Sequence, residues 1–438
     1  MGGDNMSEAA MKSENTEVDL QSLNTRVLKK IMPLLVMVYI MSFLDRTNIA
    51  MARKGMEADL GISAAAYGLG AGLFFLTYAL FEIPSNLIMY RVGARFWITR
   101  IMLTWGAVTL ATAFVWNEYS FYFMRLLLGV AEAGLFPGVM LYLTYWFESG
   151  ERAKAIGYFL LGVCIANIIG GPLGGGLLSL EGLGGLHGWQ WLLIIEGLMP
   201  MFLAFFVWKW LPDGPQSASW LTPQERQFYQ SRQSSKEAVQ DGHWWHMLKD
   251  GQIWLTIFVY FCHQIAIYTV IFFLPGIIAS YGNLTSFEVG SLNSIPWVAA
   301  SIGAVFILRT SKSPAKCRRI LFFGLVTMAL GLVLAAMLES SYGLIGYTIT
   351  AFMVFVVQSV LFVFPATRLN GESLAAGLAF VTMAGLLGGF FGPSIMGLIE
   401  QATGNVKNGL FLISGLLLTA SVVSIFLRQG QEESTVSG

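Results

Sequence analysis

The sequence has little charge and little cysteine. Only 12% of its 438 residues are Asp, Glu, Lys or Arg, and 55% are hydrophobic, so the chain cannot cover itself with polar groups in water. The three cysteines, Cys164, Cys262 and Cys317, are far apart and form neither a CxxC nor a metal-ligand pattern, which argues against a disulfide framework. The formal net charge is zero and gives no reason to expect nucleic acid as a partner.

Targeting and catalytic signatures are missing as well. The first 25 residues are polar and acidic, and the first apolar run begins near Ile31, so we expect no cleavable signal peptide. The spans and linker described below contain no Ser/His/Asp arrangement, metal cluster or phosphate loop. We therefore expect a protein that is not an enzyme and needs no cofactor.

Long apolar runs are abundant. A helix needs about 20 mostly apolar residues to cross a bilayer, and about twelve such runs are present. They lie at 31–51, 66–89, 97–115, 120–146, 155–178, 190–211, 252–279, 287–308, 320–338, 343–364, 373–399 and 408–427. The chain contains 48 glycines, which suit close helix packing in lipid. The sequence thus predicts an all-α polytopic membrane protein.

One long polar stretch divides the spans into two sets of six. We expect a cytoplasmic N-terminal segment at 1–30, a six-helix bundle at 31–212, a cytoplasmic linker at 213–251, a second six-helix bundle at 252–428 and a cytoplasmic tail at 429–438. Within the linker, residues 220–232 begin with a Thr-Pro pair followed by Glu225, which predicts a surface helix.

Lys and Arg positions predict the orientation. With both termini inside, 21 of the 26 lie on inner segments, and only Arg53, Lys54 and Lys407 lie on outer ones. Basic residues concentrate on the cytoplasmic side of membrane proteins. The remaining two, Arg46 and Arg125, fall within predicted spans.

Ionisable groups inside spans are functional candidates because burying them in hydrocarbon is costly. Asp45 and Arg46 are adjacent on the first span and point about 100° apart, so they should serve different partners. Arg125 and Glu132 are seven residues apart on one helix face. We expect these four to gather around a central cavity. The set suits anion and proton symport, because arginine holds carboxylates and a buried carboxylate can exchange protons; the alternative is a purely structural charge network.

Other polar residues inside spans are weaker candidates. Glu82 is expected to gate or brace the inner end, Glu196 to be structural, and Tyr78 to offer a hydroxyl to a substrate. In the second half the candidates are His263, Gln264, Tyr268, Gln358, Thr367, Arg368 and Thr382. An isolated histidine in an apolar helix is usually a satisfied hydrogen-bonding residue. Two glycine-rich segments, 162–176 and 383–397, occupy corresponding places and predict interrupted helices that allow bending, although close packing alone also explains them.

Two motifs carry a family resemblance. FLDRTNIA at 43–50 and RLLLGVAEAGLFPGVMLYLTYWF at 125–147, with twelve spans and a long linker, resemble the anion:cation symporters of the major facilitator superfamily from about Lys30 to Arg428. The nearest branch resembles bacterial permeases for sugar acids, tartrate and 4-hydroxyphenylacetate. The resemblance implies the major facilitator fold, with twelve transmembrane helices in two six-helix bundles.

The resemblance also implies residue roles. Asp45 and Glu132 match protonatable carboxylates, Arg46 matches a substrate-holding arginine, Arg125 an arginine coupled to the acid of its own span, and Tyr78 a substrate contact. Substrate contacts are also expected at Arg125, Asn167, His263, Gln264, Tyr268, Gln358 and Thr382.

Three departures from the family pattern qualify those roles. Phe43 stands where tyrosine is usual, and Val163 stands where glutamine is expected, with Asn167 one turn away. The pocket is therefore less hydroxylated, which favours an aromatic or short carboxylate. In the loop at 86–95, Arg91 and Arg95 match the superfamily's gating signature but Tyr90 replaces its aspartate, which puts the usual inner-gate salt bridge in doubt.

Together these features predict a secondary active transporter that imports a small organic anion by proton symport with alternating access. A monomer in a bacterial inner membrane is expected, with protons and the anion as its partners. An anion exchanger or sodium-coupled carrier of the same fold is the alternative, and a transporter-like membrane sensor is a remote one.

Overall fold

A computed structural model describes residues 19–237, 248–308, 314–338, 340–368 and 371–428, and all regular structure in these ranges is helical. The first half contains α2 (Leu20–Leu60), α3 (Ala64–Val92), α4 (Ala94–Thr112), α5 (Glu118–Glu132), α6 (Leu135–Trp146), α7 (Ser149–Leu178) and α8 (Gly188–Trp210). The second half contains α10 (Gly251–Ala279), α11 (Ser286–Leu308), α12 (Pro314–Met337), α13 (Gly343–Leu361), α14 (Val363–Ala366), α15 (Gly371–Leu386), α16 (Gly388–Thr403) and α17 (Lys407–Ser424).

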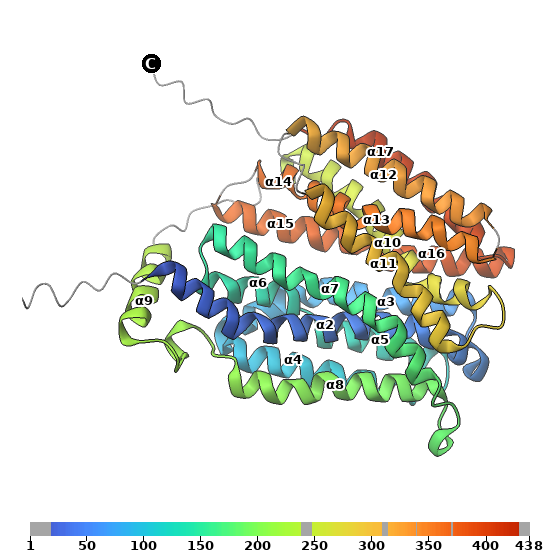
Figure 1. The fold of residues 1–438 in the computed structure, drawn as a ribbon, viewed down its shortest axis with the longest axis horizontal. Helices are drawn as coiled ribbons and strands as arrows, with labels where there is room; N and C mark the ends of the chain where they lie inside the picture. Colours follow the sequence, from blue (N-terminus) through green and yellow to red (C-terminus); the bar gives the residue numbers. More distant parts are fainter. Residues whose placement is uncertain (1–18, 238–247, 309–313, 339, 369–370, 429–438) are drawn as a thin grey trace, which may run out of the picture.

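These helices confirm the predicted all-α architecture. Ten helical stretches of the described residues are long and apolar enough to cross a membrane, three of them formed by the pairs α5 with α6, α13 with α14, and α15 with α16. Helices α4 and α11 occupy the places of the two remaining predicted spans, 97–115 and 287–308. Figure 1 shows the two halves as bundles lying side by side, with α2 to α8 in one and α10 to α17 in the other.

The linker helix marks one end of the molecule. Helix α9 (Pro223–Glu237) begins with the reciprocal cap expected from its sequence: the Thr222 amide donates to Glu225 Oε2 (2.8 Å) and the Glu225 amide donates to Thr222 Oγ1 (3.3 Å). Glu225 also pairs with Arg26 of α2. We call this the linker end, at the left of Figure 1, and the opposite end the distal end.

The fourth predicted span is not one continuous helix. Helix α5 ends at Glu132 and α6 begins at Leu135, with Gly134 between them at φ 87°. Pro137 has no N–H to donate to the Ala133 carbonyl, which instead accepts a hydrogen bond from Ser85 Oγ at 2.7 Å. Local sequence therefore explains a break directly after a buried acid.

The glycine-rich segments behave differently from the interrupted helices that were expected. Helix α7 runs unbroken through the first of them, and only the second contains a boundary, at Leu387 between α15 and α16. Both segments serve close packing: a side chain at Gly171 would meet the backbone of Gly290 on α11, and one at Gly397 would meet Ala64.

Contacts between the halves gather toward the distal end. Arg53 of α2 pairs with Glu400 of α16 at 2.7 Å, and the Tyr67 hydroxyl donates to the Phe272 carbonyl at 3.2 Å. Ser294 Oγ of α11 donates to the carbonyl of Ile168 at 2.5 Å. Together with the Gly171 to Gly290 approach, these contacts hold the two bundles together at their distal ends.

Candidate functional site

A buried ion pair lies at the middle of the first half. Arg46 of α2 donates through Nε to Glu132 Oε1 at 2.8 Å, and its terminal nitrogen lies 2.6 Å from the same oxygen. Ser42 Oγ donates to that oxygen at 2.8 Å as well. The second oxygen, Oε2, has no hydrogen-bond partner and is buried. All three of these contacts are therefore made to Glu132 Oε1, and none is made to Oε2.

Aromatic rings surround the Arg46 guanidinium. Its central carbon lies 5.0 Å from the Phe43 ring centre, 5.4 Å from that of Phe74 and 4.8 Å from that of Tyr78. Tyr268 of the second half lies within electrostatic range of the same group. Such rings stabilise a cation while excluding water from it.

The second half reaches this site through α10. The rings of Tyr268 and of Phe75 on α3 have centroids 4.2 Å apart, and Phe272 contacts Phe75 from one turn further along α10. These rings lie between the Arg46 site and the distal contacts. The site is thus closed by aromatic packing on its distal side.

Asp45 faces away from Arg46, as helix geometry predicts. Its Oδ1 accepts from Thr109 Oγ1 of α4 at 2.5 Å and from Asn48 Nδ2 at 3.4 Å. Its Oδ2 is buried without a partner. The two adjacent charges of the first span therefore belong to two different polar clusters.

Arg125 does not join Glu132, contrary to the expected coupling. It donates to the backbone carbonyls of Gly70 and Ala71 of α3, both at 3.3 Å, and its guanidinium lies 5.2 Å from the Phe74 ring centre. A carbonyl has two lone pairs and can accept from arginine while it keeps its helical bond. Arg125 therefore lies buried next to the Arg46 site without an ion pair to a described acid.

The polar residues of the second half form a separate group around a tyrosine that sequence reasoning missed. The Tyr260 hydroxyl accepts from Gln264 Nε2 at 2.8 Å and from Gln358 Nε2 at 3.3 Å. Tyr260 precedes Gln264 by four residues on α10, so helical spacing was the available signal. This group brings together two predicted substrate contacts.

Three other predicted substrate contacts form hydrogen bonds to backbone carbonyls. His263 is fully buried, and its Nε2 lies 3.0 Å from the Val354 carbonyl. Thr382 Oγ1 donates to Leu378 at 2.7 Å and Asn167 Nδ2 donates to Val163 at 2.8 Å, each within its own helix. Each side chain thus has a backbone partner, which fits a structural role, but His263 Nδ1 is buried without a hydrogen bond.

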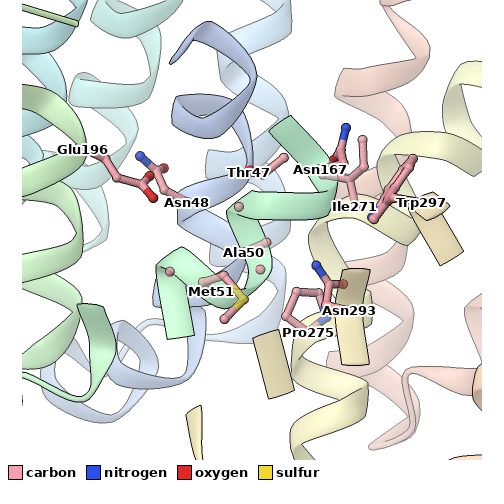
Figure 2. A pocket seen from close by; sticks show the side chains of 13 residues that line it. Thr47, Asn48, Ala50, Met51, Asn167, Glu196, Ile271, Pro275, Asn293 and Trp297 are labelled. Atoms are coloured by element: carbon pink, nitrogen blue, oxygen red, sulfur yellow. The ribbon is translucent and has the colours of Figure 1, made fainter. Parts of the chain in front are cut away.

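Asn167 also faces a small cavity between the halves, together with Asn48, Glu196, Asn293 and Trp297 (Figure 2). The cavity has room for about one water molecule. It lies on the distal side of Arg46, where α2 and α7 meet α10 and α11. No sequence pattern indicated it, because its residues come from five separate helices.

The expected gating residues occupy the linker end of the first half. Arg95 Nε donates to the Leu211 carbonyl at 2.6 Å, and the Arg95 amide donates to Asp213 Oδ1 at 2.9 Å. Asp213 thereby caps α4, whose own N-cap residue is Gly93. Arg91 is exposed, and Glu82 is buried with its Oε2 unpartnered. Arg95 thus braces the ends of α4 and α8 within one half.

The break after Glu132 yields a testable prediction. Gly134→Ala places a Cβ at positive φ and against Ser85, so we expect the free energy of unfolding to fall by roughly 1–3 kcal/mol. The melting temperature in detergent measures this. Gly157→Ala is the matched control, because Gly157 is exposed on α7 with open space around it and should leave the melting temperature unchanged or raised. Equal melting temperatures for both variants would contradict a strained break.

Comparison with known proteins places these features in context. Residues 35–393 match the family described as Major Facilitator Superfamily. A quinolone resistance transporter of Acinetobacter baumannii is 40% identical, with 91% of this chain and 94% of that protein covered. A putative tartrate transporter of Agrobacterium vitis is 38% identical over 94% and 93% of the two chains. Among solved structures, a bacterial homologue of the human lysosomal transporter Spinster, inward-facing and unoccupied, superposes with a TM-score of 0.75 at 17% identity, covering 91% of this chain and 96% of that one.

Proposed function

The chain belongs to the Major Facilitator Superfamily, and from this premise we propose that it imports a small organic anion together with protons by alternating access. It is a multi-pass membrane transporter and not an enzyme. The observation that carries the proposal is the buried Arg46 to Glu132 pair among aromatic rings.

Competition for Arg46 provides the coupling. A substrate carboxylate needs the guanidinium donors that Glu132 now occupies, because arginine binds carboxylates best through two parallel hydrogen bonds. A proton on Glu132 removes its negative charge and frees Arg46 for the substrate. The substrate anion then replaces the Glu132 charge, so the buried site keeps the same net charge before and after loading. Loading one partner without the other leaves a buried charge unpaired, which costs several kcal/mol.

The surroundings of Arg46 favour a flat or short carboxylate. Rings of Phe43, Phe74 and Tyr78 surround the guanidinium, and the second half offers the amide groups of Gln264 and Gln358 around Tyr260. The tartrate transporter among the relatives agrees with a carboxylate substrate. The quinolone resistance transporter indicates that an aromatic ligand belongs in the test panel.

Orientation follows from the distribution of Lys and Arg. We assign the linker end, with α9, to the cytoplasm of a bacterial cell, and both termini to the same side, because the basic residues favour that side 21 to 3. The bundle boundaries at 31–212 and 252–428 and the monomeric state belong to this proposal. The distal contacts then face the outside, so the site described here opens toward the cytoplasm during the transport cycle.

Purified protein in proteoliposomes tests the function. With an imposed inward proton gradient, we expect labelled tartrate or an aromatic acid to accumulate several-fold above its external concentration, and a proton ionophore to abolish the accumulation. A panel of sugar acids, hydroxy acids, aromatic acids and a quinolone identifies the substrate class by competition. Uptake that responds to a sodium gradient, or only to a preloaded anion, would replace proton symport by sodium coupling or exchange.

A further inference from the structure

A second buried acid lies beside Asp45. Glu196 of α8 is 4% exposed, and its Oε2 has no hydrogen-bond partner. Asp45 is 1% exposed, and its Oδ2 has none either. Neither carboxylate forms an ion pair with a Lys or Arg of the described ranges. This differs from Glu132, whose charge is matched by Arg46.

Asn48 connects the two acids. It lies one turn after Asp45 on α2 and donates to Asp45 Oδ1 at 3.4 Å. Figure 2 shows its amide turned toward the Glu196 carboxylate, and the two groups interact. Thr109 of α4 donates to the same Asp45 oxygen. Asp45, Asn48, Thr109 and Glu196 thus form one polar cluster between α2, α4 and α8.

The charges around this cluster do not balance two carboxylates. A cation within electrostatic range of Asp45 is Arg125 of α5, which already donates to two backbone carbonyls. Glu132, the other charged group in range, is negative or neutral and engages Arg46. Two ionised carboxylates side by side in an apolar interior are strongly disfavoured, and a single proton relieves the repulsion. A protonated carboxyl also supplies the O–H donor that the unpartnered oxygens lack.

We propose that Asp45 and Glu196 form a two-carboxylate site that holds one shared proton, separate from the Arg46 to Glu132 pair. Glu196 is then a proton-binding residue and not only a structural one. The inference rests on the proposed function where it assigns this proton to transport, and the existence of the site stands on its own geometry.

A route for the proton is present. Glu196 and Asn48 both line the cavity between the halves, with Asn167 and Asn293 on the opposite walls (Figure 2). A water molecule placed in this cavity would have polar groups of several helices around it, the Glu196 carboxyl among them. Because the cavity lies between bundles joined by distal contacts, separating those contacts opens it to the outside. The site is therefore placed to exchange its proton on the distal side.

Infrared difference spectra of the purified full-length protein, recorded across a pH titration, test the site. Wild type should show the C=O stretch of a protonated carboxylic acid at neutral pH. Glu196→Gln and Asp45→Asn should each remove one such band, because the remaining carboxylate no longer has a negative neighbour and ionises. Glu118→Gln, at the start of α5 and away from the cluster, is the matched control and should keep the band. A band that persists in both cluster variants would overturn the proposal.

Transport assays separate this inference from the proposed function. In Glu196→Gln we expect the pH profile of gradient-driven uptake to move by about one pH unit to lower pH. If Glu196→Gln leaves both the pH profile and the infrared band unchanged while wild-type uptake is still driven by protons, the shared-proton site is contradicted and the proposed function is not. Loss of the band without any proton-driven uptake in wild type supports the site and removes the transport proposal. Sodium-dependent spectral changes that Glu196→Gln abolishes would make this a cation site instead and overturn the inference.

Discussion

Arg46→Lys is expected to weaken substrate binding by about 10- to 100-fold while the protein still folds. Lysine keeps a positive charge near Glu132 but cannot present two parallel donors to a carboxylate, and losing one charge-assisted hydrogen bond costs roughly 1.5–3 kcal/mol. The measurement is the dissociation constant of the anion found in the uptake panel, determined by calorimetry on protein in detergent. Arg46→Ala is less informative, because it leaves Glu132 buried without its cation and destabilises the fold.

Arg100→Lys is the matched control for that experiment. Arg100 lies on α4 over the Trp97 ring, with its guanidinium 3.8 Å from the ring centre, and no residue of the Arg46 site contacts it. Its substitution should leave the dissociation constant within about twofold of wild type. Equal weakening by both substitutions would point to a general effect of lost arginine, and unaltered binding in Arg46→Lys would remove Arg46 from the binding site.

The helices were predictable because the lipid interior offers no hydrogen-bond partners to the backbone. Backbone groups in hydrocarbon must be satisfied within the segment, so each long apolar run had to form a helix. The structure has helices at all twelve predicted spans, and ten helical stretches are long and apolar enough to cross a membrane. The surface helix of the linker was predictable for a different reason, since Thr222 and Glu225 encode its start locally. Both signals lie within a single stretch of sequence.

The break after Glu132 was encoded locally but obscured by composition. Gly134 and Pro137 are both visible in the sequence, yet the run from 120 to 146 is apolar enough to read as one span. What stabilises the break comes from elsewhere: the Ser85 hydroxyl on α3 satisfies the Ala133 carbonyl. Helix-period reasoning cannot supply a partner 48 residues away.

The pairing of buried charges was only partly predictable. Helix geometry correctly separated Asp45 from Arg46, since their directions differ by about 100°. The same reasoning placed Arg125 and Glu132 on one face, and the family resemblance implied that they interact. In the structure Glu132 instead pairs with Arg46, and Arg125 donates to two carbonyls of α3. Which helices are neighbours decides such partners, and one sequence does not contain that information. Glu196 was undervalued for the same reason, because its neighbour Asp45 lies 151 positions earlier on another helix.

The two proposed acid sites lie in different environments, and we propose that they have different roles in transport. Glu132 shares its cation with the anion that we propose as substrate, so its proton is tied to loading. Asp45 and Glu196 form no ion pair in the described residues, and Glu196 lines the cavity between the halves. Binding competition therefore belongs to the first site, and the second provides a place where a proton is held independently of the anion. Substitutions at the two sites should separate accumulation from exchange.

Glu132→Gln should abolish accumulation driven by a proton gradient, seen as a loss of at least tenfold, and should leave counterflow exchange of the anion largely intact. Glutamine is nearly isosteric with the protonated acid, so Arg46 stays free for the substrate in both orientations of the carrier, but no proton can be bound or released there. Uptake into proteoliposomes with an imposed gradient, and exchange into proteoliposomes preloaded with unlabelled anion, measure the two activities in one preparation. Glu118→Gln, fourteen residues earlier on the same helix α5, should retain both. Loss of both activities in Glu132→Gln would assign Glu132 to substrate binding or folding, and retention of both would move the coupling proton to another residue.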